Sequence, residues 1–182
     1  VVAMDVQGSK VCSVTLESGE VIGAGQVVNA SGPRGALTAK MAGIALPVEP
    51  RKRFTWIFSA EQPLDQDLPL TIDPSGVHFR QDGPKTYLAG SPPDLEDDVA
   101  VDPYGVDSPD FIVGEDFAHM WTSALAHCQK RFEGQFEFYK NEASGGIGSF
   151  TPDSFPVFDV FRENCYLIAD SNHGYKMLGV GK

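Results

Sequence analysis

Two short apolar strands that pass through small residues into helices constrain the fold of this 182-residue chain more than any other feature. The first strand is predicted at Gln26–Asn29 and continues through Ala30-Ser31-Gly32 into a helix that ends at Gly43. The second is predicted at Tyr166–Ala169 and continues through Asp170-Ser171-Asn172-His173-Gly174 into the start of another helix. Small residues ahead of a helix N-terminus let a ligand approach the backbone closely, so the two corners are candidate binding elements.

Short runs of apolar residues predict further strands outside the two corners. Two of these strands, at 11–16 and 20–22, precede the first corner. The others lie between the corners, at 51–60, 68–73, 77–81, 86–90 and 135–143. One long helix is predicted at Glu115–Phe132, because its apolar residues recur at helical spacing. Residues 91–114 are expected to form a surface excursion and Ser144–Gly148 a flexible loop. Thr151–Asp153 is expected to form a rigid turn that leads into the apolar segment Phe155–Val157. The sum is an α+β fold with a largely antiparallel sheet, one long helix and a strand–turn–helix piece at each end.

Composition excludes several classes of protein. The chain has 25 acidic and 14 basic residues and a net charge of −11, which argues against non-specific binding to nucleic acid or an anionic membrane. It contains no apolar run long enough to span a bilayer. Cys12, Cys128 and Cys165 are an odd, widely spaced set, which favours a reducing compartment and predicts a cytoplasmic location. The four histidines match no zinc motif, so no metal site is expected.

The second corner carries the polar groups that chemistry requires. Lys176 can offer a cation to a carboxylate, and His173 can donate or accept a proton near a reacting centre. The alternatives are an ordinary strand-to-helix turn at each corner and a solvated helix lysine at position 176. The chain has no G-x-S-x-G, P-loop or G-x-G-x-x-G motif, so hydrolase and kinase functions have no support.

Four segments together resemble motifs of one family, the FAD-dependent D-amino-acid oxidase, sarcosine oxidase and glycine oxidase superfamily. Val27–Pro33 resembles its "VVNAAGPW" corner, and Pro47–Lys52 resembles its "PVxPxKG" approach to the substrate domain. Thr151–Val157 resembles its "TPDGxPxIG" segment, and Asn172–Met177 resembles its "GHGxK" flavin-contacting turn. The segments occur in the family's order and span nearly the whole chain.

The resemblance implies two domains that are interleaved in sequence. Residues 1–45 and 146–182 would be parts of a Rossmann-like FAD-binding domain, and residues 46–145 a substrate-binding domain. The family's amino-terminal G-x-G-x-x-G, which binds the pyrophosphate, does not occur here. Both ends of the sequence look cut, so we expect a carboxy-terminal fragment that lacks the amino-terminal part of the FAD domain and is inactive alone.

The resemblance also implies an activity and the residues that carry it. The family removes a hydride from the carbon that bears an amine and transfers it to flavin, which implies FAD as cofactor and an amino acid or N-methyl amino acid as substrate. Ala30, Ser31 and Gly32 would lie near the ADP half of FAD, and Asn172, His173, Gly174 and Tyr175 near the flavin. Lys176 matches the lysine that binds the substrate carboxylate, and it is expected beside His173 in the catalytic set.

Departures from the family pattern bear on the cofactor and the electron acceptor. Gly145–Gly148 stands where some relatives have a cysteine that attaches flavin, so non-covalent FAD is expected. In sarcosine oxidase a lysine assists the reaction with oxygen, and its position aligns near Leu88 of this chain, with Lys85 close by. This departure leaves dehydrogenase activity open.

Two alternatives to a complete enzyme remain. The chain could be a non-catalytic module that keeps the substrate-domain sheet and binds a partner or ligand without flavin. It could also be a dehydrogenase subunit whose FAD site is completed by another chain.

Overall fold

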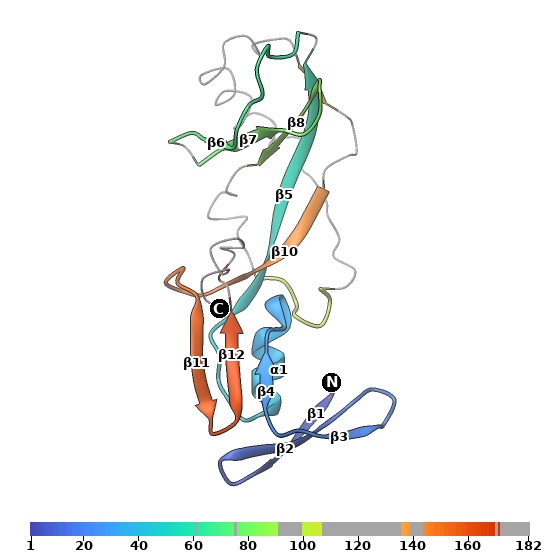
Figure 1. Cartoon of the computed structure of the whole chain (residues 1–182), viewed down its shortest axis with the longest axis vertical. Coiled ribbons are helices and arrows are strands. Elements are labelled where there is room, and N and C mark those ends of the chain that lie inside the picture. The colour runs from blue at the N-terminus through green and yellow to red at the C-terminus, as the bar shows by residue number, and fades with distance from the viewer. Residues whose placement is uncertain are drawn as a thin grey trace. The chain divides into compact units, whose positions relative to one another are not determined.

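The computed structural model describes residues 1–60, 62–74, 76–90, 100–106, 136–138, 144–169 and 171 (Figure 1). The chain divides into two compact units. The first comprises Val1–Arg51, Ala100–Pro109 and Ile147–Lys182, and the second comprises Lys52–Val99 and Asp110–Gly146. The described residues are mostly strand, as the sequence predicts, and the strands form three sheets rather than one. The helix predicted at 115–132 lies outside the described residues, and the assignment of FAD and substrate domains stays a prediction.

The first unit begins with an antiparallel meander. It consists of β1 (Ala3–Gln7), β2 (Lys10–Thr15) and β3 (Val21–Gly23) in the order β1-β2-β3. The sequence predicted β2 and β3 but not β1. In β1 the partly buried Met4 and Val6 alternate with exposed residues, and both pack against the core of the unit. Only two of the five residues of β1 face the core, which is too few for the alternation of apolar and polar residues to predict a strand.

A second three-stranded sheet combines segments that are far apart in the chain. Its order is β11 (Val157–Arg162), β12 (Cys165–Ala169) and β4 (Val27–Asn29). β11 and β12 form an antiparallel hairpin, and β12 pairs with β4 in parallel, with Leu167 opposite Asn29. β4 and β12 were predicted, whereas β11 was expected only as an apolar segment after a turn. The parallel pairing places the carboxyl ends of β4 and β12 at the same edge of this sheet.

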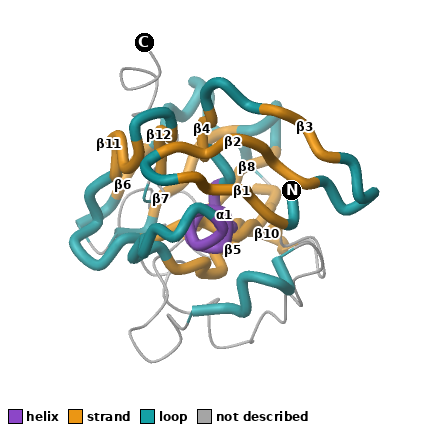
Figure 2. Tube along the Cα trace, turned by 90° about the horizontal axis from the view of Figure 1, so that it is seen from below, coloured by secondary structure: helices purple, strands orange, loops and turns teal. Residues whose placement is uncertain are grey.

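One face of this sheet packs against the helical segment that follows β4. A 3₁₀ turn (η1, Gly32–Arg34) leads into α1 (Gly35–Met41), the α-helix of the described part of the chain (Figure 2). Gly43 ends the helix with φ +70°, a conformation that favours glycine, and the predicted end is confirmed. The buried core of the unit consists of Val11, Ala39, Ala42, Ile44, Leu46, Val48, Cys165, Leu167 and Ala169. Burial also raises the pKa of the Cys165 thiol.

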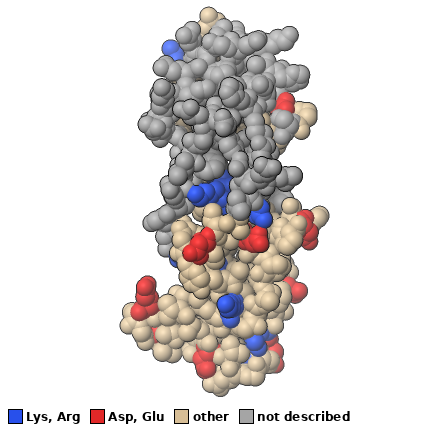
Figure 3. All heavy atoms as spheres, turned by 180° about the vertical axis from the view of Figure 1, so that it is seen from behind, with Lys and Arg blue, Asp and Glu red and all other residues tan. Residues whose placement is uncertain are grey.

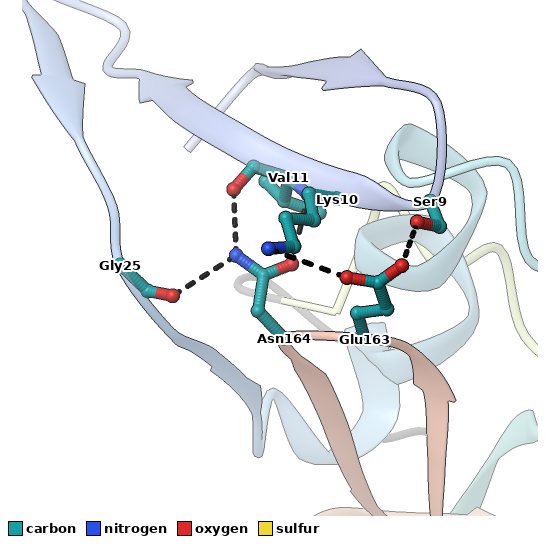
Figure 4. Close-up of polar contacts among 6 residues, drawn as sticks. All are labelled: Ser9, Lys10, Val11, Gly25, Glu163 and Asn164. Carbon is teal, nitrogen blue, oxygen red and sulfur yellow. Dashed lines mark hydrogen bonds and ion pairs between the residues drawn. The ribbon is translucent and has the colours of Figure 1, made fainter.

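The turn between β11 and β12 joins the meander to the second sheet (Figure 4). Asn164 is buried, its Oδ1 accepts the Val11 N–H at 2.9 Å, and its Nδ2 donates to the carbonyl oxygens of Val11 at 2.8 Å and Gly25 at 3.0 Å. Arg162 donates from Nε to the Ala42 carbonyl at 2.6 Å and from Nη1 to the Gly8 carbonyl at 3.2 Å. Side chains of one hairpin turn thus bind backbone groups of the meander and of the helix end.

Glu163 adds a pH-dependent contact at the same turn (Figure 4). The Ser9 hydroxyl donates to Glu163 Oε1, and the Lys10 ammonium lies 3.3 Å from Oε2. The Ser9 hydrogen bond, and then the Lys10 hydrogen bond and charge, lower the pKa of Glu163. Because the folded-state pKa is lowered, this stabilisation is present above the ordinary glutamate pKa and is lost as the pH falls through the folded value.

We therefore expect Glu163→Gln to lower the denaturant midpoint at neutral pH, with the difference from wild type shrinking as the pH falls below about 4. The effect is modest, because both side chains are exposed to solvent. Denaturant unfolding at a series of pH values measures it. A difference that stays constant from neutral to acidic pH would contradict a role for the carboxylate charge.

The second unit is built on a sheet in the order β10-β5-β8-β7-β6, in which β9 also pairs with β5. The strands are β5 (Glu49–Ala60), β6 (Thr71–Ile72), β7 (His78–Gln81), β8 (Thr86–Gly90), β9 (Phe136–Phe138) and β10 (Ser144–Phe150). The boundaries between the units fall inside β5 and β10. Phe58 and Tyr87 are fully buried in the sheet, and their rings stack with centroids 5.4 Å apart.

Two expectations for this sheet are wrong. Ser144–Gly148 forms part of β10 and not a loop, because strand pairing uses backbone groups that glycine also carries. The strand expected at 68–73 covers only Thr71–Ile72. Leu68 donates its N–H to the side chain of Gln81 at 2.9 Å, and Pro69 has no N–H for a ladder. β9 lies within the predicted strand 135–143, of which only residues 136–138 are described.

Charged side chains are spread over the described surface. On the face in Figure 3, acidic and basic side chains of this part of the chain lie interspersed. None of the helices in the described residues has the length and apolar character needed to cross a membrane. The described part of 91–114, residues 100–106, is mostly exposed loop, as expected.

Candidate functional site

The two predicted corners begin at the same edge of one sheet. β4 ends at Asn29 and runs into Ala30, while β12 ends at Ala169 and is followed two residues later by Ser171. Because the two strands are parallel neighbours and Asn29 pairs with Leu167, both carboxyl ends lie at one edge of the sheet, and β12 continues two residues past this pair. In open sheets with parallel strands, ligands bind in the crevice outside the carboxyl ends of the strands.

The buried side chain of Asn29 stabilises the first corner by hydrogen bonds to its backbone. Its side chain is only 3% exposed, and its Nδ2 donates to the Gly35 carbonyl at 2.9 Å. Its Oδ1 accepts the Ser31 N–H at 3.2 Å. Both polar atoms of one buried amide are therefore used to shape the turn between β4 and α1. Sequence reasoning missed Asn29 as a positioning residue, although a polar residue that ends an apolar strand is a usable signal.

The surface of this corner is open to a ligand. Ala30 and Ser31 are exposed. Gly32 has φ +55°, and a Cβ placed on it would meet no atom within 4 Å. The small residues leave space beside the Gly32 backbone, and the nucleotide contact expected for Ala30, Ser31 and Gly32 stays a prediction.

The helix expected to assist that approach is weaker than predicted. Ser31 makes no side-chain cap bond, and its hydroxyl accepts a hydrogen bond from Thr38 at 3.0 Å. Helical structure starts with a 3₁₀ turn at Gly32–Arg34, and α1 itself has seven residues. So short a helix supplies little macrodipole, and the corner contributes close approach rather than a strong anion site.

The second corner is held by a pair of buried hydroxyls. Ser171 is 2% exposed and has φ +51°, and Thr151 is 7% exposed. The two hydroxyl oxygens lie 2.7 Å apart, and Thr151 N donates to Ser171 Oγ at 3.2 Å. The sequence indicated only a turn at Thr151–Asp153, and its contact with the second corner depends on the pairing of distant segments.

The turn that carries Thr151 is closed by its own polar groups. Thr151 Oγ1 donates to the Phe155 carbonyl at 2.7 Å, and Phe155 N donates to Asp153 Oδ1 at 3.1 Å. The Phe155 N–H is the main cause of a lowered Asp153 pKa. The carboxylate therefore stays ionised and keeps the turn closed. The segment that resembles "TPDGxPxIG" thus has a structural role at this edge.

The remaining predicted site residues lie outside the described residues. They are Asn172, His173, Gly174, Tyr175 and Lys176. The structure thus brings Ala30, Ser31 and Gly32 to the same sheet edge as Ser171, and the roles of residues 172–176 stay predictions. Within the described ranges, no three His, Cys, Asp or Glu residues are grouped to hold a metal ion.

Comparison of the sequence with known families and proteins finds FAD-dependent oxidoreductases. The profile of the DAO family, described as FAD dependent oxidoreductase, matches residues 1–182. The FAD-dependent oxidoreductase domain-containing protein 1 of Xenopus laevis is 30% identical over 143 residues, which is 67% of this chain and 28% of that protein. The Mus musculus protein of the same name is 28% identical over 129 residues, which is 68% of this chain and 26% of that protein. The matched segment therefore spans less than a third of either relative.

Solved structures share the fold. L-proline dehydrogenase from P. horikoshii superposes with a TM-score of 0.73 at 20% identity, covering 99% of this chain and 49% of that one. Glycine oxidase from Geobacillus kaustophilus gives a TM-score of 0.68 at 20% identity, covering 96% of this chain and 43% of that one. Iminodiacetate oxidase from Chelativorans sp. BNC1 gives 0.70 at 13% identity, with 98% and 45% covered.

Proposed function

This chain belongs to the FAD-dependent oxidoreductase family, and we propose that the whole protein oxidises the C–N bond of an amino acid or an N-methyl amino acid. Bound FAD supplies the hydride acceptor for this chemistry. The names of the structurally similar proteins support the substrate class, since L-proline, glycine and iminodiacetate each carry a carboxylate next to the carbon that bears nitrogen.

The observation that carries the proposal is the parallel pairing of β4 with β12. It sets the Ala30-Ser31-Gly32 corner beside the end of β12, from which the chain continues to Asn172. We assign the first corner to the ADP half of FAD, because its small, exposed residues leave the backbone approachable. We assign the backbone of Asn172, His173, Gly174 and Tyr175 to the flavin half.

The proposed substrate contacts come from one residue of this flavin-binding segment and from the residue that follows it. Lys176 is proposed to pair with the substrate carboxylate, which orients the carbon that loses hydride. His173 is proposed to hold or release a proton near the reacting amine. Gly145–Gly148 offers no cysteine, so we propose that FAD is held without a covalent bond.

The pyrophosphate needs a further binding element. These 182 residues contain no G-x-G-x-x-G motif, and they match less than a third of the relatives' length. We therefore propose that the rest of the protein supplies this element, and that the 182 residues alone do not turn over substrate.

An absorption spectrum of the purified whole protein tests the function. We expect a flavin band that bleaches under anaerobic conditions with one or more members of a panel of amino acids and N-methyl amino acids. Acid precipitation should leave the yellow colour in the supernatant, as non-covalent FAD requires. Recovery of the band with oxygen or with an artificial electron acceptor separates an oxidase from a dehydrogenase. A folded whole protein that is colourless and takes up no added FAD would refute the proposal.

A further inference from the structure

We propose that Thr151 and Ser171 form a hydroxyl latch that holds the chain leaving β12 in the conformation required to bind the flavin half of FAD. The latch is the pair of buried side chains that joins the Thr151–Phe155 turn to the second corner. The inference rests on the proposed function, because that function assigns the segment after Ser171 to the flavin. It makes Thr151 and Ser171 positioning residues.

The hydrogen bonds of the latch have defined directions. The Phe155 carbonyl has no proton to give, so Thr151 Oγ1 must donate across the 2.7 Å contact. The single Thr151 hydroxyl proton is then used, and Ser171 must donate to Thr151 Oγ1 across the other 2.7 Å contact. Ser171 Oγ in turn accepts the Thr151 N–H at 3.2 Å. A valine at position 151 can therefore neither accept from Ser171 nor donate to Phe155.

The backbone at the latch needs such support. Ser154 and Ser171, with φ +60° and +51°, are the two non-glycine residues with positive φ in the described part of the chain. Ser154 lies in the turn that carries Thr151, and Ser171 contacts Thr151 through its hydroxyl. This conformation is disfavoured for residues with a Cβ, and it persists where surrounding contacts hold it. Without the latch, Ser171 loses a contact that opposes its relaxation to negative φ, which would redirect the chain toward Asn172.

The two corners have separate anchors, which makes the inference specific. Asn29 shapes the first corner, which we assign to ADP. Thr151 and Ser171 shape the second, which leads to the segment that we assign to the flavin. Loss of the latch should therefore weaken binding of FAD and leave binding of ADP unchanged.

The experiment measures dissociation constants of FAD and of ADP for the cofactor-free whole protein, by quenching of protein fluorescence. For Thr151→Val we expect the FAD dissociation constant to rise about tenfold, as for loss of one well-formed buried hydrogen bond. The ADP constant should stay within about twofold of wild type, since a change of that size is well below one hydrogen bond. Neither measurement depends on turnover.

Matched variants separate the hydroxyl from the shape of the side chain. Thr151→Ser keeps the hydroxyl and should restore FAD affinity. Thr71→Val removes an exposed hydroxyl that donates to the Pro69 carbonyl at 3.0 Å in the other unit, and it should change neither constant. Ser171→Gly removes the partner hydroxyl at a position where glycine tolerates positive φ, and it should show the same selective loss if Thr151→Val does not fold.

The outcomes distinguish the latch from the proposed function. Unchanged FAD affinity in Thr151→Val and Ser171→Gly would overturn the latch while the proposed function stands. Equal weakening of FAD and ADP would also overturn it, because a general loss of structure does not select the flavin half. A folded wild-type protein that binds FAD no more tightly than ADP would refute the flavin assignment itself.

Discussion

Replacing Lys176 by methionine in the whole protein should lower kcat/KM for a carboxylate-bearing amino acid about 100-fold, mostly through a higher KM. Loss of one partner of a desolvated charge pair costs about 3 kcal/mol, and each 1.4 kcal/mol corresponds to about tenfold. The effect falls mainly on KM, because the carboxylate contact is made in the ground state as well as in the transition state. Steady-state kinetics on the substrate identified by flavin bleaching measure it.

A substrate analogue without its carboxylate makes the prediction specific. If Lys176 binds that group, wild type and Lys176→Met should oxidise the decarboxylated amine with similar kcat/KM. Lys40→Met removes an exposed lysine from the last turn of α1 and serves as the matched control, with no change expected on either substrate. An equal loss of activity on both substrates would show that Lys176 acts on something other than the carboxylate.

Local sequence patterns predicted the elements whose ends are set by neighbouring residues, such as a glycine or a turn. The end of α1 was predicted at Gly43, whose φ of +70° is a conformation that favours glycine. β7 (His78–Gln81) and β8 (Thr86–Gly90) match the strands predicted at 77–81 and 86–90, because turn residues separate short runs of strand-forming residues. The same reasoning located both corners of the candidate site, because each corner follows a short apolar strand.

Patterns failed where pairing between strands, rather than the alternation of residues along one strand, decides the structure. β10 is a strand although it contains glycines, because its backbone pairs within the sheet of β5. β11 has the apolar run Val157-Phe158 and exposed residues on both of its faces, so its sequence lacks a clear alternation. Its partner is the neighbouring strand β12, and the pairing rather than the pattern defines it.

The polar residues that build the site were not recognised from the sequence. Asn29, Thr151 and Ser171 are buried and bind backbone or one another, yet their residue types are usually exposed. Only the tertiary structure shows which polar side chain lies opposite which backbone group. The sequence therefore located the two corners, and the structure adds the polar groups that hold them in shape.

Asn164 gives the largest expected effect on folding stability. Its side chain satisfies three backbone groups, the N–H and carbonyl of Val11 and the carbonyl of Gly25, and it is 8% exposed. Asn164→Ala leaves these groups without their partner, and we expect the free energy of unfolding to fall by about 3 kcal/mol, roughly 1 kcal/mol for each hydrogen bond lost. Urea unfolding of the whole protein, followed by circular dichroism, measures it.

Gln7→Ala is the matched control, because it removes an exposed amide whose Nε2 donates to Asp5 in the same meander. It should change the free energy of unfolding by no more than about 0.5 kcal/mol.

Asn164→Asp tests the direction of the hydrogen bonds. The new carboxylate can still accept from Val11 N–H, but it faces two carbonyl oxygens to which the amide donated. These oxygens disfavour the charged form, so the folded-state pKa of that carboxylate is raised. Its destabilisation should be greatest at neutral pH and should be relieved as the pH falls through that raised value, where the protonated acid donates again. A stability loss in Asn164→Asp that is equal at neutral and acidic pH would contradict donation by this amide to the meander.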